Sequence, residues 1–541
     1  MKNNTLPKVA YFCMEYGLKT DFKLYAGGLG ILAGDHLKAA KELGVPLVGI
    51  GILWKQGYTE QHIGEDGYPY DAYRNYTRNY DFLKDTNVKV KVKIRNQDIY
   101  CKVWLVDTFD NAPLYLLDTD IPENGDRWIT GQLYGWFGEE RVAQEIVLGI
   151  GGVRALRALG IDVDVYHFNE GHAALAGLEL IREKMENEKM SFEEAWHATR
   201  QQIVFTTHTP VVEGNESHKL ELLMYMGANN GLTINQMSEI GGVPFNMTVA
   251  GLRLSRIANG VSKLHGQTAN KMWEHVEGKS PIISITNGID RNTWVDNRII
   301  EAYNKGEGLL NSHNVIKNEL IDFINKRTGV KLDPEKLLIG FSRRAAPYKR
   351  SDLIFTNDEI IGDHLRSNEI QMVFSGKGHP LDDVGKQIIA KLIEMTKKYP
   401  TSVVFLEDYD MTIGKMLTRG SDVWLNNPRR PKEASGTSGM KAAMNGVLNL
   451  STLDGWWPEA CVDGKNGWQF GDGFESEDTN ILDKHDLDAL YNVLLNKVVP
   501  TYYNDKNKWE NMMRESIKTT YEAFSATRML KEYYDLMYKK G

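Results

Sequence analysis

The sequence predicts an α/β protein with two domains, each built on a parallel sheet. Apolar runs typical of buried strands alternate with segments of helical periodicity, which is the pattern of strands joined by crossover helices. The chain has 541 residues, enough for two to four domains at roughly 150 residues each. Hydrophobic residues make up 42% and charged residues 25%, which is ordinary globular usage and excludes disordered and fibrous classes.

The second half of the chain shows the alternation most regularly. Strands are predicted at Leu337–Phe341, Ile370–Phe374, Val403–Leu406, Val423–Leu425 and Val447–Leu450. The segment from Val384 to Lys398 between the second and third of these has apolar positions every three or four residues. Asp382 and Asp383 precede it and Pro400 follows it, so both ends of a crossover helix are signalled.

The first half repeats this alternation less regularly. Strands are predicted at Val9–Phe12, Leu47–Leu53, Val88–Ile94, Tyr100–Val106, Leu114–Leu117, Val163–Tyr166 and Ile203–Thr206. The polar, strand-poor stretch from 291 to 334 separates the two halves, so we place a hinge at Asn287–Trp294. The predicted domains are residues 1–290 and 291–520, followed by an amphipathic helix in 521–541.

Charge, cysteine usage and hydropathy limit the partners and the compartment. The net charge of −8 and the pI near 6.0 argue against a nucleic acid partner. Cys13, Cys101 and Cys461 have neither redox nor metal spacing, which favours a reducing cytoplasm. The first residues lack a secretory apolar region, and the early apolar stretch Gly44–Trp54 is too short to span a bilayer, so no membrane is expected as partner.

A small-residue loop after the predicted strand Val423–Leu425 is a candidate anion site. The loop runs from Glu433 to Gly446, with glycines and hydroxyl residues where a short helix begins. Lys441 in that helix has only apolar neighbours on either side, so a desolvated, nucleophilic lysine is one interpretation. A lysine that extends its charge to solvent is the other, and its neighbours alone favour this one.

Further polar loops follow other predicted strands. Four cations lie between Arg343 and Arg350, directly after Leu337–Phe341, which favours anion binding over a solvated surface run. Gly27–Gly30 opens a predicted helix at Leu32–Leu43 and is a second backbone site for an anion or a sugar. The loops Phe168–His172 and Thr206–Pro210 also carry polar groups, but no metal-ligand spacing occurs in them, so no metal site is predicted.

Together these motifs resemble the α-glucan (glycogen, starch and maltodextrin) phosphorylase family in its short bacterial or archaeal form. The residues that resemble the family's signature are Glu433–Lys441 with Gly446, Thr452–Gly455, Arg343-Arg344 and Tyr348–Arg350. The similarity continues through Gly27–Gly30, Asn169–His172, His208-Thr209, Thr286–Ile289 and Val404–Glu407 with Tyr409. It covers nearly the whole chain in order, and the lysine-containing loop is its most specific part.

The resemblance implies a GT-B architecture, with two Rossmann-like domains facing each other across a cleft and the last helix crossing back to the first domain. It also implies pyridoxal 5'-phosphate bound covalently to Lys441. The catalytic residues would be Lys441, Arg344, Lys349 and His208. The cofactor would contact Arg343, Gly436, Thr437, Gly28 and Tyr409 besides Lys441. The substrate-binding residues would be Leu29, Asn287, Glu433, Ser435 and Gly436, with Glu170 and His172 from the polar loop.

The activity implied is transfer of a terminal glucosyl unit from an α-1,4-glucan to inorganic phosphate with retention, giving α-D-glucose 1-phosphate. Arg343, Arg344 and Lys349 would then neutralise two adjacent phosphates, which would otherwise repel strongly. A homodimer is expected by resemblance. The alternative is a retaining glycogen or starch synthase that uses a sugar nucleotide, but this alternative leaves Lys441 without a role.

Overall fold

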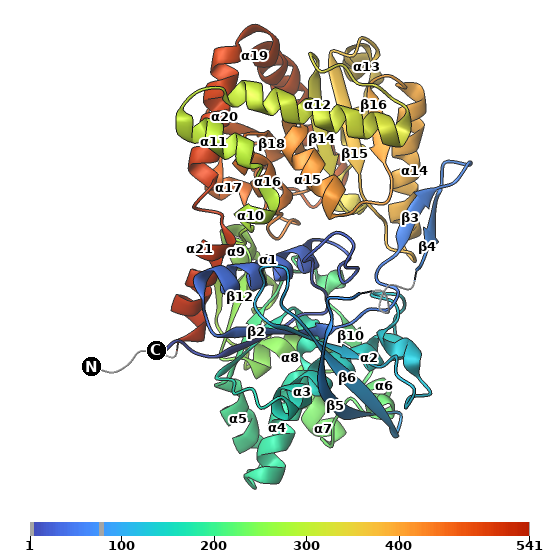
Figure 1. Cartoon of the computed structure of the whole chain (residues 1–541), viewed down its shortest axis with the longest axis vertical. Helices are drawn as coiled ribbons and strands as arrows, with labels where there is room; N and C mark the ends of the chain where they lie inside the picture. Colours follow the sequence, from blue (N-terminus) through green and yellow to red (C-terminus); the bar gives the residue numbers. More distant parts are fainter. Residues whose placement is uncertain (1–4, 75–79, 540–541) are drawn as a thin grey trace. The chain divides into compact units, whose positions relative to one another are not determined.

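The computed structural model describes residues 5–74 and 80–539, which form two compact units (Figure 1). Unit 1 comprises the described residues of Met1–Tyr58, Tyr73–Thr286 and Ala526–Gly541. Unit 2 comprises Thr59–Ala72 and Asn287–Ser525. Neither unit is one continuous stretch of chain, and each has its own buried apolar core. The α/β class predicted from the sequence is confirmed.

Unit 1 is built on a mixed, mostly parallel sheet with the order β13-β12-β9-β8-β1-β2-β7-β6-β5. Only β5–β6 and β6–β7 pair antiparallel within it. All of the strands predicted in the first half occur, but β12 and β13 are too short and too polar to be recognised from the sequence. The strands are β1 (Val9–Phe12), β2 (Leu47–Ile52), β5 (Lys84–Ile94), β6 (Gln97–Val106), β7 (Leu114–Asp118), β8 (Val165–Asn169), β9 (Ile203–Thr206), β12 (Ile257–Gly260) and β13 (Ile282–Ser284).

Unit 2 contains a parallel sheet with the order β16-β15-β14-β17-β18-β19. Its strands are β14 (Leu337–Ser342), β15 (Ile370–Ser375), β16 (Val403–Leu406), β17 (Val423–Asn426), β18 (Leu448–Thr452) and β19 (Gly467–Phe470). The five strands predicted here are confirmed. The crossover helix is also confirmed, since α14 spans Asp383–Lys398 and the Asp382 side chain accepts a hydrogen bond from the Gly385 amide.

Helices cover both sheets (Figure 1). Those of unit 1 are α1 (Gly28–Leu43), α2 (Glu139–Ile146), α3 (Gly152–Ala158), α4 (Leu175–Asn187), α5 (Phe192–Arg200), α6 (Leu220–Met226), α7 (Ile234–Gly241), α8 (Met247–Leu254), α9 (Lys263–Met272) and α21 (Ala526–Tyr533). Those of unit 2 are α10 (Arg291–Trp294), α11 (Asn297–Lys305), α12 (Leu309–Thr328), α13 (Asp358–Arg366), α14, α15 (Met411–Gly420), α16 (Ser438–Met444), α17 (Trp457–Ala460), α18 (Thr479–Val493), α19 (Val499–Asn504) and α20 (Lys506–Thr520). Within the described ranges, none of the helices combines the length and apolar character that crossing a bilayer requires.

The last helix returns to the first unit, as predicted. Helix α21 packs against α1, and Figure 1 shows the red end of the chain beside the blue helix. Met529 and Leu530 are buried in the unit 1 core. Just beyond the helix, Tyr538 shares a 2.7 Å hydrogen bond with Nδ1 of His167 in β8. A segment distant in sequence thereby completes the core around the central strands.

A hairpin from the first half of the sequence packs in unit 2. It consists of β3 (Glu60–Ile63) and β4 (Pro69–Ala72), which pair antiparallel. The buried amide of Gln61 donates to the Gly378 carbonyl at 3.0 Å and accepts from the Gly378 amide at 2.9 Å. Asp71 forms a 2.6 Å ion pair with Lys386 of α14. These polar contacts fasten the hairpin to the loop after β15 and to α14.

Helix α1 passes so close to the preceding loop that one of its positions requires glycine. A Cβ atom on Gly34 would lie 2.0 Å from the carbonyl oxygen of Gly17, which is backbone and cannot rotate away. We therefore expect Gly34→Ala to lower the free energy of unfolding by about 1–3 kcal/mol, as overpacking of a core does. Gly125→Ala is the control, because a Cβ atom there meets nothing within 4 Å. The measurement is the urea midpoint of each variant, and equal midpoints for the two would contradict the expectation.

Candidate active site

Unit 2 gathers basic side chains at the carboxyl end of β14. Arg343 follows this strand and donates from Nη1 to Ser438 Oγ at 3.2 Å, while its Nη2 pairs with the carboxylate of Glu433. Lys349 donates to Glu433 Oε2 at 3.2 Å. Arg344 is exposed, and its charge acts on Lys349. We call Arg343, Arg344, Lys349 and Glu433 the cation group, in which two of the three basic side chains pair with the one carboxylate.

The excess of positive charge is visible in the pKa values of this group. Burial, together with the charge of Arg343, lowers the pKa of Lys349 to about 7. Burial alone would raise the pKa of Glu433, but Arg343 and Lys349 bring it down to about 2. At neutral pH the Glu433 carboxylate is therefore ionised, whereas the pKa of Lys349 lies close to the pH. An anion bound here would stabilise the protonated lysine, so the arrangement favours a phosphate or another oxyanion.

Arg350, the fourth cation of the same sequence run, does not belong to this group. It is buried and forms ion pairs with Asp486 at 2.7 Å and Asp483 at 3.1 Å. Its Nε also donates to the Asn427 carbonyl at 2.7 Å. Arg350 therefore holds the loop after β17 against α18, and the prediction that all four cations face an anion is wrong for this one.

Lys441 lies in α16 and is buried, contrary to the interpretation in which its charge reaches solvent. Its Nζ lies 3.8 Å from the ring centroid of Trp294, in cation–π geometry. Asn445 connects the two residues, because its side-chain amide donates to the Lys441 carbonyl at 2.8 Å and to the Trp294 carbonyl at 3.1 Å. Trp294 was not recognised from the sequence, since nothing local links it to Lys441.

The other predicted residues of unit 2 are Ser435, Gly436 and Thr437 in the loop before α16, with Tyr409 and Asn287 elsewhere in the unit. Gly436 has a φ of +71°, and a Cβ atom on it would lie 3.5 Å from Arg343 Nη1. The Ser435 carbonyl accepts from the Trp456 amide at 2.9 Å, and Thr437 is the residue before α16. Tyr409 is buried, which raises its pKa to about 12. Asn287 is also buried in this unit, at the start of its second segment.

In unit 1, the carboxylate of Glu15 accepts hydrogen bonds from backbone amides of the glycine loop. Glu15 Oε2 accepts from the amide of Ala26 at 2.6 Å and from that of Gly27 at 3.2 Å. Gly28 and Leu29 form the first turn of α1, and a Cβ atom on Gly28 would meet nothing within 4 Å. Glu15 was not predicted, although it follows β1 at the carboxyl edge of the sheet, where functional residues gather.

The polar loops after β8 and β9 lie together in unit 1, as their equivalent positions in the sheet predict. His208 Nε2 and Asn169 Oδ1 are 2.5 Å apart, and burial lowers the pKa of His208 to about 3, so its ring is neutral. Glu170 Oε2 accepts from the His208 amide at 2.9 Å and from Thr209 Oγ1 at 3.1 Å. Glu170 therefore positions the loop that carries His208.

His172 borders a pocket of about 350 Å³ in the same unit. Burial lowers the pKa of His172 to about 4, and its Nδ1 is buried with no hydrogen-bond partner among the described residues. The lining is mostly polar and comes from five segments of the chain. It consists of Phe137, Arg141, Glu170, Gly171, His172, Thr209, Glu213, Gly214, Asn215, Glu216, Ser217, Met247 and Thr248.

An ion-pair network centred on Glu216 forms one side of this pocket. Glu216 lies 3.2 Å from Arg141 Nη1 and 3.3 Å from His218 Nε2, and His218 in turn lies 2.9 Å from Glu145. Burial alone would raise the pKa of Glu216, but His218 and Arg141 lower it well below its usual range. The run from Glu213 to His218 was missed in the sequence, although its position after the β9 loop could have signalled it.

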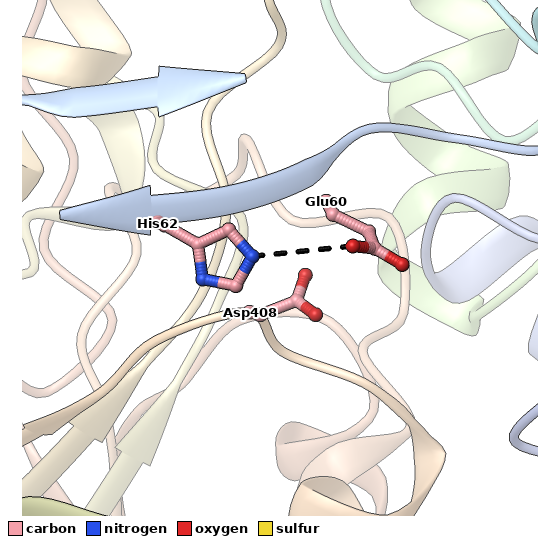
Figure 2. A group of neighbouring side chains, drawn as sticks. All are labelled: Glu60, His62 and Asp408. Carbon is pink, nitrogen blue, oxygen red and sulfur yellow. Dashed lines mark ion pairs between the residues drawn. The ribbon is translucent and has the colours of Figure 1, made fainter. Parts of the chain in front are cut away.

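Two groups of potential metal ligands occur among the described residues, and each already has a basic partner. One is Glu145, Glu216 and His218, where Arg141 neutralises Glu216. The other is Glu60, His62 and Asp408 in unit 2, which Figure 2 shows between the β3 hairpin and the loop after β16. There Lys377 lies 2.9 Å from Asp408. Both groups form ion-pair networks. That the protein has no metal site stays a prediction.

Comparison with known proteins identifies the family. The family model for carbohydrate phosphorylases matches residues 154–239 and 297–471. A protein named maltodextrin phosphorylase from Thermococcus litoralis is 40% identical, over 98% of this chain and 70% of its own. A protein named glycogen phosphorylase from Aquifex aeolicus is 36% identical, over 98% of this chain and 86% of its own. An uncharacterized protein of Methanocaldococcus jannaschii is 37% identical, over 98% of this chain and 99% of its own. The chain belongs to the carbohydrate phosphorylase family.

Proposed function

We propose that this protein is a cytoplasmic α-1,4-glucan phosphorylase that uses pyridoxal 5'-phosphate and transfers a terminal glucosyl unit to inorganic phosphate with retention. The observation that carries the proposal is the cation group, whose three basic side chains outnumber its one carboxylate and whose Arg343 contacts α16, the helix of the buried Lys441. The substrate class comes from the relatives named maltodextrin and glycogen phosphorylase.

The residues around Lys441 fit the cofactor. The Lys441 amine is buried, and Arg343 Nε is buried with no hydrogen-bond partner in the part of the chain described. Gly436, in its left-handed conformation, leaves the approach to the Arg343 guanidinium free of a side chain. In the proposal Lys441 binds the pyridoxal, while Arg343, Gly436 and Thr437 hold its phosphate. When bound, the cofactor supplies a phosphate that acts as acid and base toward the substrate phosphate.

The protein side chains would supply charge and orientation. Arg344 and Lys349 bind inorganic phosphate, which protonates the leaving glycosidic oxygen and then bonds to the anomeric carbon on the same face. Glu433 keeps Arg343 and Lys349 in place through its two ion pairs. In unit 1, the neutral His208 hydrogen-bonds the glucosyl unit, positioned by Glu170 and Asn169. Negative charge accumulates on phosphate oxygens, so no protein carboxylate has to act as nucleophile.

The test is release of glucose 1-phosphate from maltodextrins in phosphate buffer by the purified protein. We expect phosphate-dependent release with retention of the α configuration, assigned by proton NMR of the product. A parallel assay offers a sugar nucleotide with a glucan acceptor and no phosphate. Elongation in that assay, without glucose 1-phosphate in the first, would replace the proposal by the glucan synthase alternative. Size-exclusion chromatography with light scattering tests the homodimer expected by resemblance.

A further inference from the structure

The turn after β18, residues Asp454 to Trp456, holds the loop that carries Glu433 at two points of its backbone. The Glu433 amide donates to Asp454 Oδ2 at 2.9 Å. Two residues further on, the Ser435 carbonyl accepts from the Trp456 amide at 2.9 Å. Because β17 and β18 are parallel neighbours, the loops that follow them lie at the same edge of the sheet. The backbone of Glu433 is therefore fixed independently of its side-chain ion pairs.

Asp454 is buried, and backbone amides engage both of its carboxylate oxygens. The residue is 1% exposed, and its Oδ1 accepts from the Gly455 amide at 2.8 Å while Oδ2 accepts from that of Glu433. Burial raises the pKa of Asp454, although the two amides act in the opposite direction. Burying a carboxyl group costs free energy unless it is hydrogen-bonded, and the two amides supply those bonds. Asp454 thus acts through its geometry, as a fixed pair of acceptors.

The turn and the loop are packed too closely for a side chain between them. A Cβ atom on Gly455 would lie 2.1 Å from the Ser435 carbonyl oxygen. Trp456 is also close to the first turn of α16, since a Cβ atom on Gly439 would lie 2.8 Å from the indole Nε1. The Trp456 ring is buried and packs edge-on against Phe524, with 5.0 Å between ring centroids. The turn therefore supports the loop from its first residue to the start of α16.

The position of Glu433 matters because its carboxylate acts on the charge of Lys349. Burial lowers the pKa of Lys349, and so do Arg343 and Arg344, whereas Glu433 raises it. The ring of Tyr348, the remaining group that faces the ammonium, has its centroid 5.1 Å away. Displacing the Glu433 carboxylate from its 3.2 Å contact with Lys349 would remove the effect that opposes burial and the two arginines. The lysine would then lose its proton at a lower pH.

We propose that Asp454 is a positioning residue of the phosphate site: it fixes the backbone of Glu433 and thereby places the Glu433 carboxylate against Lys349. This inference rests on the proposed function, in which Lys349 binds inorganic phosphate, and deepens it by naming the residue that sets the geometry of that site. Asp454 acts through Glu433, so its loss should affect phosphate binding only as far as Glu433 moves.

The experiment compares Asp454→Asn with the wild-type protein in calorimetric titrations with inorganic phosphate at several pH values around neutrality. Asparagine keeps the size of the side chain but replaces one acceptor oxygen by a donor, so one of the two buried amides loses its partner. Phosphate affinity at neutral pH should fall roughly fivefold to hundredfold, the effect of one unsatisfied buried donor. Its decline with rising pH should begin at a lower pH than in the wild type. In phosphorolysis, KM for phosphate should rise by the same factor.

A double variant separates this positioning role from a general loosening of the site. In a Glu433→Gln background the carboxylate that Asp454 places is already gone, so adding Asp454→Asn should change phosphate affinity by less than about twofold. Losses that add up in the double variant would overturn the proposal. So would an Asp454→Asn protein whose affinity declines at the wild-type pH.

Asp478→Asn is the matched control, because Asp478 also accepts from two backbone amides of unit 2. They are those of Asn480 at 2.9 Å and Ile481 at 3.3 Å, at the start of α18. This variant should bind phosphate like the wild type, and equal losses in it and in Asp454→Asn would contradict a specific role of Asp454.

Folding and the proposed function have separate readouts. The urea midpoint and gel retardation in amylopectin report whether Asp454→Asn is folded. Asp454→Glu is the second variant: it keeps a carboxylate but places it one methylene too far, so its affinity should lie between those of Asp454→Asn and the wild type, and wild-type affinity would contradict the proposal. Wild-type protein that binds phosphate but releases no glucose 1-phosphate would overturn the proposed function alone, and the titrations would still decide the role of Asp454. Wild-type protein that binds no phosphate would overturn both.

Discussion

Replacing Lys441 by alanine is expected to abolish glucan phosphorolysis and to remove covalently bound pyridoxal from the purified protein. Lys441 is buried in α16, the helix whose Ser438 accepts a hydrogen bond from Arg343 of the cation group, and in the proposal it is the residue that binds the pyridoxal. The measurements are the pyridoxal absorption of the protein, and peptide mapping after borohydride reduction. Wild-type protein should carry the modification on Lys441, and the variant should be colourless.

Lys415 provides a matched control for this experiment. Its ammonium lies 6.0 Å from the ring centroid of Trp294, the same ring that Lys441 contacts at 3.8 Å. Lys415→Ala should therefore keep both the pyridoxal and the activity. Modification of a lysine other than Lys441, or a colourless wild-type protein that still phosphorolyses glucan, would refute the assignment.

Lys349→Ala is expected to reduce phosphorolysis by about a hundredfold to a thousandfold while leaving glucan binding nearly unchanged. The substitution removes one of the three cations that would neutralise the phosphates, a loss comparable to removing one preorganised donor from a charged transition state. Glucan affinity is measured by gel retardation in amylopectin, and the reaction by glucose 1-phosphate release. An equal loss of both would contradict the role given to Lys349.

The pH dependence gives this residue a second readout. Because the pKa of Lys349 is held near 7, its charge is present below about pH 7 and is lost as the pH rises through that value. Phosphate affinity should therefore decline above neutral pH in the wild-type protein. Lys349→Arg keeps its charge throughout, so the decline should disappear in this variant. Comparing the two proteins also cancels the titration of phosphate itself. Parallel pH profiles would show that another group is responsible.

Local signals in the sequence predicted much of the fold. The helix α14 could be predicted with both ends because its apolar period, its Asp382 cap and the following Pro400 all lie within one stretch of chain. The strands of unit 2 were found for the same reason, as short apolar runs bounded by polar loops. The gathering of Arg343 and Lys349 followed from one further rule, that functional loops lie at the carboxyl ends of parallel strands.

What could not be predicted depends on partners far away in the sequence. Arg350 and Lys349 are neighbours in the chain, yet Arg350 turns to Asp486 while Lys349 turns to Glu433. Nothing near Arg350 reveals which acid it meets. The hairpin of Gln61 is likewise fastened to Gly378, which no local pattern indicates. Tertiary ion pairs and hydrogen bonds therefore decided which members of a predicted cluster belong to the site.

The order in which the two units can complete their cores follows from the position of α21. Unit 1 includes Ala526–Gly541, so its core lacks Met529 and Leu530 until residues 287–525 have left the ribosome. At roughly 5–20 residues per second, that interval lasts on the order of tens of seconds. During it, the surface of α1 that α21 covers is open to solvent and to chaperones. Unit 2 can close around its sheet first, and the domain that begins at the N-terminus is the last to be completed.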